Sequence, residues 1–287
     1  AQTFLAAAKK LPNLRVETRA FTTRLLVEGK RCVGVEFRKG GAGGPVHTLR
    51  AAREVIVSGG TINSPHLLQV SGIGPSAHLK SIGVEVVHDL PGVGANLGDH
   101  YATRVSARVK DAESINELAR GWRLGREIAK FFLRGNGALT FGVSSAQIFC
   151  RSREGLAAPD IQLLFSPATY AEGKFGVLER EPGMTVAVSI ARPESRGTIM
   201  AKSADPFVRP SLKPNYLSAP NDLRVALAGI AHVRRILAQP ALAPHLVRET
   251  LPGKHVQSDR DLETFIRQTG TTIYHIVGTC KMGDDPM

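Results

Sequence analysis

The histidine at position 275 is the residue whose type and surroundings best suit acid–base chemistry. It lies in TTIYHIVGTCKMG, where a short apolar strand is predicted to open into a loop of small residues, after a helix that ends near Gly270. An imidazole has a reference pKa of about 6.5, so near neutral pH it can accept a proton from an alcohol and later release it. A single histidine among apolar neighbours is more often structural, so His275 alone does not establish catalysis.

A second stretch, GGTINSPHLLQVSGIG, has the residue types of a ligand-binding turn and follows the strand-like REVIVS. Gly59 and Gly60 remove Cβ atoms where the backbone must bend sharply or approach a ligand. Asn63 or Ser64 can cap the following helix, and Pro65 suits its first position. Unpaired amides would then lie at the carboxyl end of a strand, where open α/β sheets bind ligands. Because many α/β proteins make such turns and bind nothing there, the stretch alone is a weak nucleotide signal.

Five segments together resemble the glucose–methanol–choline oxidoreductase family, whose members use FAD to oxidise alcohols. GGTINSPHLLQVSGIG meets each restricted position of a family signature. Four more segments are similar to family segments and follow the family's order: LPGVGANLGDH (90–100), RPESRGTI (192–199), SADPFVRPSLKPNYLSAPNDLRV (203–225) and YHIVGTCKMG (274–283). The resemblance covers nearly the whole chain and is greatest to the branch that contains choline dehydrogenase and bacterial alcohol dehydrogenases.

The resemblance implies an activity and a set of site residues. A hydride passes from the alcohol carbon to flavin N5, and the hydroxyl proton passes to a base, which gives an aldehyde or ketone. The resemblance implies that His275 is this base, or a hydrogen-bonding partner of the alkoxide. It also implies that the backbone at Thr22 meets the adenine end of FAD and that Ser58, Gly59 and Gly60 lie near the dinucleotide. An edge-strand threonine without a ligand stays an alternative for Thr22.

The predicted fold class is α+β, with part of an α/β FAD-binding domain and an antiparallel-sheet substrate-binding domain that carries helices. Residues 1–90 are assigned to the FAD domain, 91–268 to the substrate domain, and 269–287 to a return segment that carries the histidine. Alternating residues around Gly29 predict a β-hairpin, and VHTLRAAREVIV predicts a further strand that is covered on both faces. The substrate pocket is expected to draw on residues 141–148 and on the 160s.

The middle of the chain predicts helices and short strands. A helical composition over 111–134 ends at Gly135, and SSAQIFC, DIQLLF, MTVAVSIA and GTIM read as strands of an antiparallel sheet with one open face. Apolar residues at helical spacing over 223–237 predict a helix with Ser218 as its cap. The helix DLETFIRQ should be capped by Ser258 and followed by Gly270.

Composition limits the compartment and the partners. The 287 residues carry a net charge of +12, yet the basic residues are dispersed, so we predict no nucleic-acid binding. The positive charge suits a small anionic cofactor or acidic lipid headgroups, so peripheral membrane association stays open. No secretion signal or bilayer-spanning stretch is recognised, and three widely spaced cysteines fit a reducing compartment, so a cytoplasmic location is expected.

Other readings have less support. No G-x-S-x-G elbow accompanies Ser144 and Ser145, which argues against a hydrolase, and no second ligand pair accompanies His275 and Cys280, so no metal is predicted. A non-catalytic binding module derived from the same fold stays an alternative. The family's G-x-G-x-x-G unit and its last segment, with a second His or Asn, are expected outside this chain. We therefore expect the 287 residues alone to bind FAD poorly and to turn over nothing. The alcohol, the electron acceptor and the oligomeric state cannot be read from the sequence.

Overall fold

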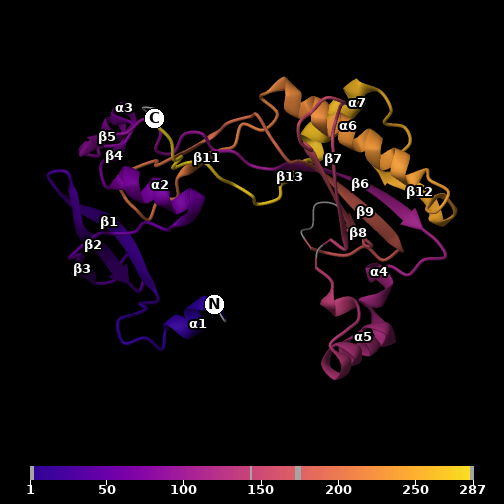
Figure 1. The fold of residues 1–287 in the computed structure, drawn as a ribbon, viewed down its shortest axis with the longest axis horizontal. Coiled ribbons are helices and arrows are strands. Elements are labelled where there is room, and N and C mark those ends of the chain that lie inside the picture. The colour runs from indigo at the N-terminus through magenta and orange to yellow at the C-terminus, as the bar shows by residue number, and fades with distance from the viewer. Residues whose placement is uncertain (1–2, 143, 172–175, 285–287) are drawn as a thin grey trace. The chain divides into compact units, whose positions relative to one another are not determined.

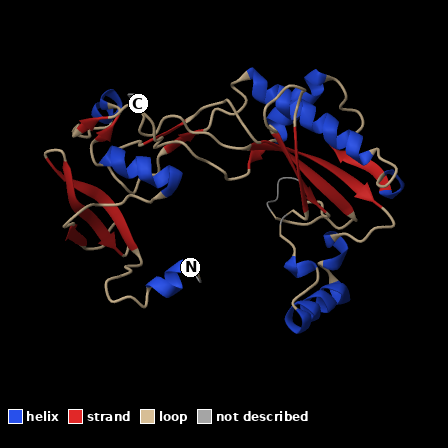
Figure 2. Ribbon diagram, in the orientation of Figure 1, coloured by secondary structure: helices blue, strands red, loops and turns tan. Residues whose placement is uncertain are grey.

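A computed structural model describes residues 3–142, 144–171 and 176–284 (Figure 1). The chain forms two compact units. The first comprises Ala1–Leu97, Gly197–Pro214 and Val277–Met287, and the second comprises Gly98–Arg196 and Asn215–Ile276. Within the described residues helices and strands occur in both units, as an α+β chain requires (Figure 2).

The first unit begins with a three-stranded antiparallel sheet. β1 (Ala20–Glu28) and β2 (Arg31–Lys39) form the predicted hairpin, and β3 (Val46–Arg50) pairs with β2 on its other side. Gly29 in the hairpin turn has φ +60°, a conformation that glycine adopts without steric cost. The hairpin prediction is confirmed.

Gln69 joins α2 to the segment at Val93 and to strand β10 in the first unit. Its side chain is fully buried in α2, donates to the carbonyl oxygens of Val93 (3.2 Å) and Ile199 (3.0 Å), and accepts from the amide of Ala201 (2.6 Å). β4 and β5 pair in parallel, and β10 and β11 pair antiparallel. These elements are α1 (Phe4–Ala8), α2 (Gly60–Val70), β4 (Ile73–Gly74), α3 (Ser76–Ser81), β5 (His88–Asp89), β10 (Thr198–Met200) and β11 (Ser211–Lys213).

Two expectations for this unit are wrong. The strand predicted from VHTLRAAREVIV ends at Arg50, and residues 54–58 pair with no strand among the described residues. A strand exists only where a neighbour accepts its hydrogen bonds, and 78% of Ile56 is exposed. The following helix begins at Gly60, with Gly59 as its N-cap, so neither Asn63 nor Ser64 caps it and Pro65 lies inside it.

The second unit is built on one antiparallel sheet, in the order β12-β6-β9-β8-β7, with β13 also paired to β6. Every neighbouring pair is antiparallel, as predicted for this region. GTIM is the exception, because it forms β10 in the first unit and pairs with β11. The strands are β6 (Tyr101–Val109), β7 (Ala146–Cys150), β8 (Ile161–Ser166), β9 (Gly183–Ile190), β12 (Leu246–Leu251) and β13 (Thr271–Thr272).

Two helices cover one face of this sheet (Figure 1). α6 (Pro220–Leu237) packs on β8, β9 and β6, and α7 (Asp259–Thr269) packs on α6 and β6. Ser258 caps α7 as predicted, since its hydroxyl accepts from the amide of Asp261. Ser218 does not cap α6, because the N-cap is Ala219 and Pro220, which has no N–H to satisfy, opens the helix. The shorter helices are α4 (Ile115–Leu118), α5 (Gly121–Arg134), η1 (Ala138–Thr140) and η2 (Ala243–His245).

Candidate functional site

Strand pairing brings His275 beside His100. β13 pairs antiparallel with the start of β6, and the amide of Ile273 donates to the carbonyl oxygen of His100 at 3.2 Å. Tyr274 then turns the chain at φ +65°. The Nδ1 atoms of His275 and His100 lie 3.2 Å apart, and the ring centroids lie 5.2 Å apart at an interplanar angle of 64°. His275 is exposed, whereas His100 is half-buried, so the pair has one face open to solvent.

A buried carboxylate, that of Asp99, accepts a hydrogen bond from the backbone of His275. Asp99 is 6% exposed, and its Oδ1 accepts from the backbone amide of His275 at 3.1 Å. Its Oδ2 accepts a short hydrogen bond from the hydroxyl of Tyr216. Burial first, and then this bond to Asp99, raise the pKa of Tyr216 to about 12, so Tyr216 stays a hydrogen-bond donor near neutral pH.

His275 limits the protonation of His100. Burial lowers the pKa of His100, the nearby His275 lowers it further, and Asp99 acts in the opposite direction. A hydrogen bond between two Nδ1 atoms needs a hydrogen on one of them and a lone pair on the other, so both rings cannot be imidazolium in this geometry. The pair can therefore accept or release one proton at a time.

Tyr101 supports the chain before His275. Its hydroxyl donates to the carbonyl oxygen of Ile266 at 2.7 Å, and its ring lies 4.9 Å from the ring of Tyr216. A Cβ at Gly270 would lie 2.3 Å from atoms of the Tyr101 ring, so only glycine lets the chain pass from α7 into β13 at this point.

The residues predicted to hold a cofactor lie in the first unit, whereas His275 lies in the second. Thr22 is half-buried in edge strand β1, opposite Phe37. Ser58, Gly59 and Gly60 are exposed at the start of α2. Gly60 has φ +75°, and a Cβ built there would meet none of the described atoms within 4 Å.

The segment after His275 is anchored to the start of α2. Thr279 is buried, and its hydroxyl donates to the carbonyl oxygen of Thr61 at 2.6 Å. In a regular helix the N–H four residues later would donate to this oxygen, but Pro65 has none. Thr279 therefore supplies the donor that Pro65 lacks. A Cβ at Gly278 would lie 2.5 Å from the backbone oxygen of Asn96, so this segment also passes too close to its neighbour for any side chain.

Two sequence models of one family match the chain, one over residues 1–102 and the other over residues 193–287, and both describe GMC oxidoreductases. The chain belongs to the GMC oxidoreductase family. An oxygen-dependent choline dehydrogenase of Pseudomonas putida is 42% identical over 288 aligned positions, which cover 100% of this chain and 50% of that protein. The chain thus spans about half the length of the curated relatives it matches.

Solved structures of GMC oxidoreductases have the same fold. A formate oxidase of Aspergillus oryzae RIB40 matches with a TM-score of 0.87 and 24% identity, over 96% of this chain and 52% of that one. A pyridoxine 4-oxidase from Mesorbium loti matches with a TM-score of 0.80 and 25% identity, over 98% of this chain and 50% of that one. The predicted family and fold class are thereby confirmed, and the members of this family are FAD-dependent oxidoreductases.

The chemistry of the first unit's residues suits part of a dinucleotide. The start of α2 has the exposed hydroxyl of Ser58 and the exposed backbone of Gly59 and Gly60, whose amides are hydrogen-bond donors. Such donors suit the phosphate or ribose oxygens of FAD, and the missing Cβ at Gly60 leaves room for a ligand's close approach. The residues present therefore fit this part of the cofactor.

Three residues of the site were not predicted. His100 and Asp99 end the segment LPGVGANLGDH, and that motif was their only sequence signal. Tyr216 lies in the family-like segment 203–225, but nothing local marked it, because its role depends on its distance from Asp99. Of the predicted pocket-lining stretch, Phe141 and Ile148 are exposed, and Val143 lies outside the described residues. Among the residues described, no three His, Cys, Asp or Glu side chains gather in a set that could hold a metal ion.

Proposed function

We propose that the full-length protein oxidises an alcohol to an aldehyde or ketone with FAD, and that His275 accepts the hydroxyl proton. The observation that supports this most is an exposed imidazole in a GMC oxidoreductase, with its backbone held by buried Asp99 and its Nδ1 3.2 Å from the Nδ1 of His100. In this proposal Ser58, Gly59 and Gly60 lie along the dinucleotide.

The cofactor would accept the hydride, and residues of the chain would bind the cofactor and accept the proton. FAD, when bound, supplies the acceptor for the hydride that leaves the alcohol carbon. Thr22 meets the adenine end through its backbone, which tolerates a change of side chain. Because the Nδ1 of His275 faces His100, its Nε2 is the atom that binds the substrate hydroxyl and takes its proton.

The proposed substrate is a small primary alcohol such as choline. This rests on the relatives named oxygen-dependent choline dehydrogenase, which are about 40% identical to this chain. A non-catalytic binding module is the competing hypothesis. A binding module does not require an exposed imidazole held beside a second imidazole and a buried carboxylate.

The test is the variant His275→Ala in the full-length protein. We expect turnover of a panel of primary alcohols, choline included, with an artificial electron acceptor to fall by roughly 10²–10⁴-fold, the usual contribution of a general base. The flavin absorbance should persist, because the replaced ring is proposed to contact substrate. His88→Gln, at an exposed histidine of β5, is the matched control and should keep its turnover. Unchanged turnover of His275→Ala would exclude the proposed base.

We also propose peripheral association with an anionic membrane, on the cytoplasmic side, through α5. This helix has four basic residues and one acidic residue. The acidic one, Glu127, is buried and bonds to Lys130 (2.7 Å) and to the amide of Ala138 (2.8 Å), whereas Arg126 and Arg134 are exposed. The apolar side chains of Trp122, Phe132 and Leu133 are 72–83% exposed. An outward apolar face beside basic groups suits lipid headgroups and their acyl boundary. No helix among the described residues is long and apolar enough to cross a bilayer.

A further inference from the structure

Asp99 occupies a costly position that the proposed reaction does not by itself explain. A carboxylate at 6% exposure loses most of its hydration, and such a group persists only where hydrogen bonds compensate. Both of its oxygens are engaged, one by the backbone amide of His275 and the other by the hydroxyl of Tyr216. These two donors come from segments that are 59 positions apart in the chain, and both bond to this one carboxylate.

The first consequence is mechanical. The chain turns at Tyr274 with φ +65°, a conformation that is unfavourable for a non-glycine residue and persists only where neighbours hold it. The bond from the amide of His275 to Asp99 fixes the residue that follows this turn. Because Tyr216 holds the other oxygen, the carboxylate cannot rotate away without breaking a second bond.

The second consequence is electrostatic. The negative charge of Asp99 favours protonation of His100, and the hydrogen bond from Tyr216 withdraws part of that charge. Two further groups face the same region: Tyr101 and, from α7, Arg267, whose positive charge acts on Tyr101. Tyr274 is exposed beside His275. Of these groups only Asp99 both contacts the backbone of His275 and is itself anionic.

We infer that Asp99 and Tyr216 act together as a positioning pair, which fixes the backbone of His275 and, through the charge of Asp99, tunes the protonation of His100 beside it. The inference rests on the proposed role of His275. Asp99 and Tyr216 touch neither substrate nor cofactor in this scheme, and they act through the imidazoles.

The test compares Asp99→Asn and Tyr216→Phe in the full-length protein, with the pH dependence of kcat/KM for an oxidised alcohol as the readout. Asp99→Asn keeps an acceptor for the amide of His275 but removes the charge, so we expect the acidic limb to move to lower pH by roughly one unit. Tyr216→Phe removes a hydrogen bond to Asp99 and so leaves more negative charge on that carboxylate. The acidic limb of the profile should then move to higher pH by roughly half a unit. Tyr170→Phe removes a tyrosine hydroxyl elsewhere in the second unit and should leave the profile unchanged.

Shifts in opposite directions support the positioning pair, because a purely structural role predicts none. Profiles that coincide with the parent, or that move the same way in both variants, would overturn it. If Asp99→Asn fails to fold, Tyr216→Phe decides alone, since an upward shift supports the inference and an unchanged limb contradicts it. His275→Ala, run in parallel, separates the two ideas. If His275→Ala loses turnover but the profiles of Asp99→Asn and Tyr216→Phe are unshifted, only the positioning pair is refuted. If His275→Ala keeps full turnover, the proposed base is refuted.

Discussion

Single side chains decide how α2 and the segment after His275 hold together. Thr279 donates to the carbonyl oxygen that Pro65 leaves without its helical partner, so a β-branched hydroxyl residue in one segment compensates for a proline in another. Asp99 has a comparable role in the second unit, where its carboxylate accepts a hydrogen bond from the amide of His275. In both units a polar side chain far along the chain replaces a bond that local backbone geometry does not provide.

His66 gives a pH-dependent stability at the same scale. It lies buried in α2, its Nε2 has no hydrogen-bond partner among the described residues, and burial lowers its pKa. The unfolded chain, with a histidine pKa of about 6.5, therefore binds a proton before the folded protein does. Stability is fully present above that value and is lost as pH falls from about 6.5 through the lower folded pKa.

We expect His66→Phe in the full-length protein to weaken this dependence. The melting temperature should drop less between pH 8 and pH 5 in the variant than in the parent, as measured by differential scanning calorimetry. The value at pH 8 reports the packing change alone, and His100 contributes equally to both proteins, so the comparison isolates His66. An identical drop in parent and variant would contradict the assignment.

At the scale of elements, the second unit depends on close contact between α6 and the sheet. Gly229 lies on the buried side of α6, and a Cβ there would lie 2.2 Å from Cγ1 of Val188 in β9. The absence of a side chain lets helix and strand approach, and so supports the sheet whose strand β6 directly follows Asp99 and His100. The same pairing of β6 with β13 brings His275 to them.

Two glycine replacements test this packing. Gly229→Ala should destabilise the full-length protein by roughly 1–3 kcal/mol, because the added methyl overpacks a buried contact. Gly125→Ala in α5, where a Cβ would meet none of the described atoms within 4 Å, should instead stabilise by roughly 0.5–1 kcal/mol through helix propensity. Thermal unfolding of both variants measures the difference. If Gly229→Ala is as stable as Gly125→Ala, α6 has more room than its contacts indicate.

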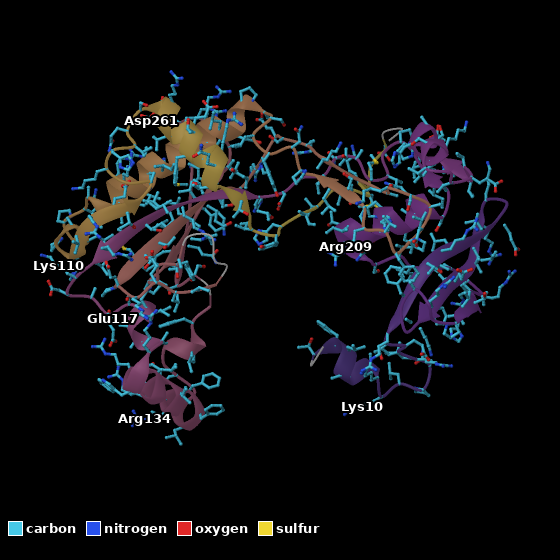
Figure 3. The ribbon with its side chains drawn as sticks, turned by 180° about the vertical axis from the view of Figure 1, so that it is seen from behind. Lys10, Lys110, Glu117, Arg134, Arg209 and Asp261 are labelled. Carbon is cyan, nitrogen blue, oxygen red and sulfur yellow. The ribbon has the colours of Figure 1, made fainter. Side chains whose placement is uncertain are left out.

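At the scale of the whole molecule, charge and exposed apolar surface coincide on α5. The chain carries a net charge of +12, and Figure 3 labels Arg134 at the end of this helix and Glu117 at α4. Each basic residue near an anionic surface contributes about 1 kcal/mol to binding, and buried apolar area adds to this.

We expect the full-length protein to bind vesicles that contain phosphatidylglycerol, and not vesicles of pure phosphatidylcholine, in a flotation assay. The double variant Phe132→Glu, Leu133→Glu should lose this binding, whereas Leu49→Glu, at an exposed apolar residue of β3, should retain it. Flotation measures the bound fraction, and size-exclusion chromatography of the same variants reports whether a second copy covers α5 instead. Unaltered flotation of the double variant would contradict a membrane role for this helix.

Much of the chain could be predicted from its sequence because the deciding signals are local. Turn glycine, alternating strand residues and a capping serine specify the β1–β2 hairpin and α7 over a few positions, and motifs read in order identify the family. Where a prediction failed, as at residues 54–58 and at the start of α2, the outcome depended on a partner outside the local window. His275 could be singled out because its motif is continuous.

Only the tertiary structure decided what surrounds His275. His100 is 175 positions away and Asp99 is 176, and they reach the imidazole because β13 and β6 pair in one register. Tyr216 joins them through a fold that places a loop against the same carboxylate. No local pattern encodes such a meeting, since the free energy that fixes it comes from burying the whole sheet and its helices rather than from the residues that meet. The sequence determined the family and the imidazole, and the fold determined the carboxylate and the second ring that act on it.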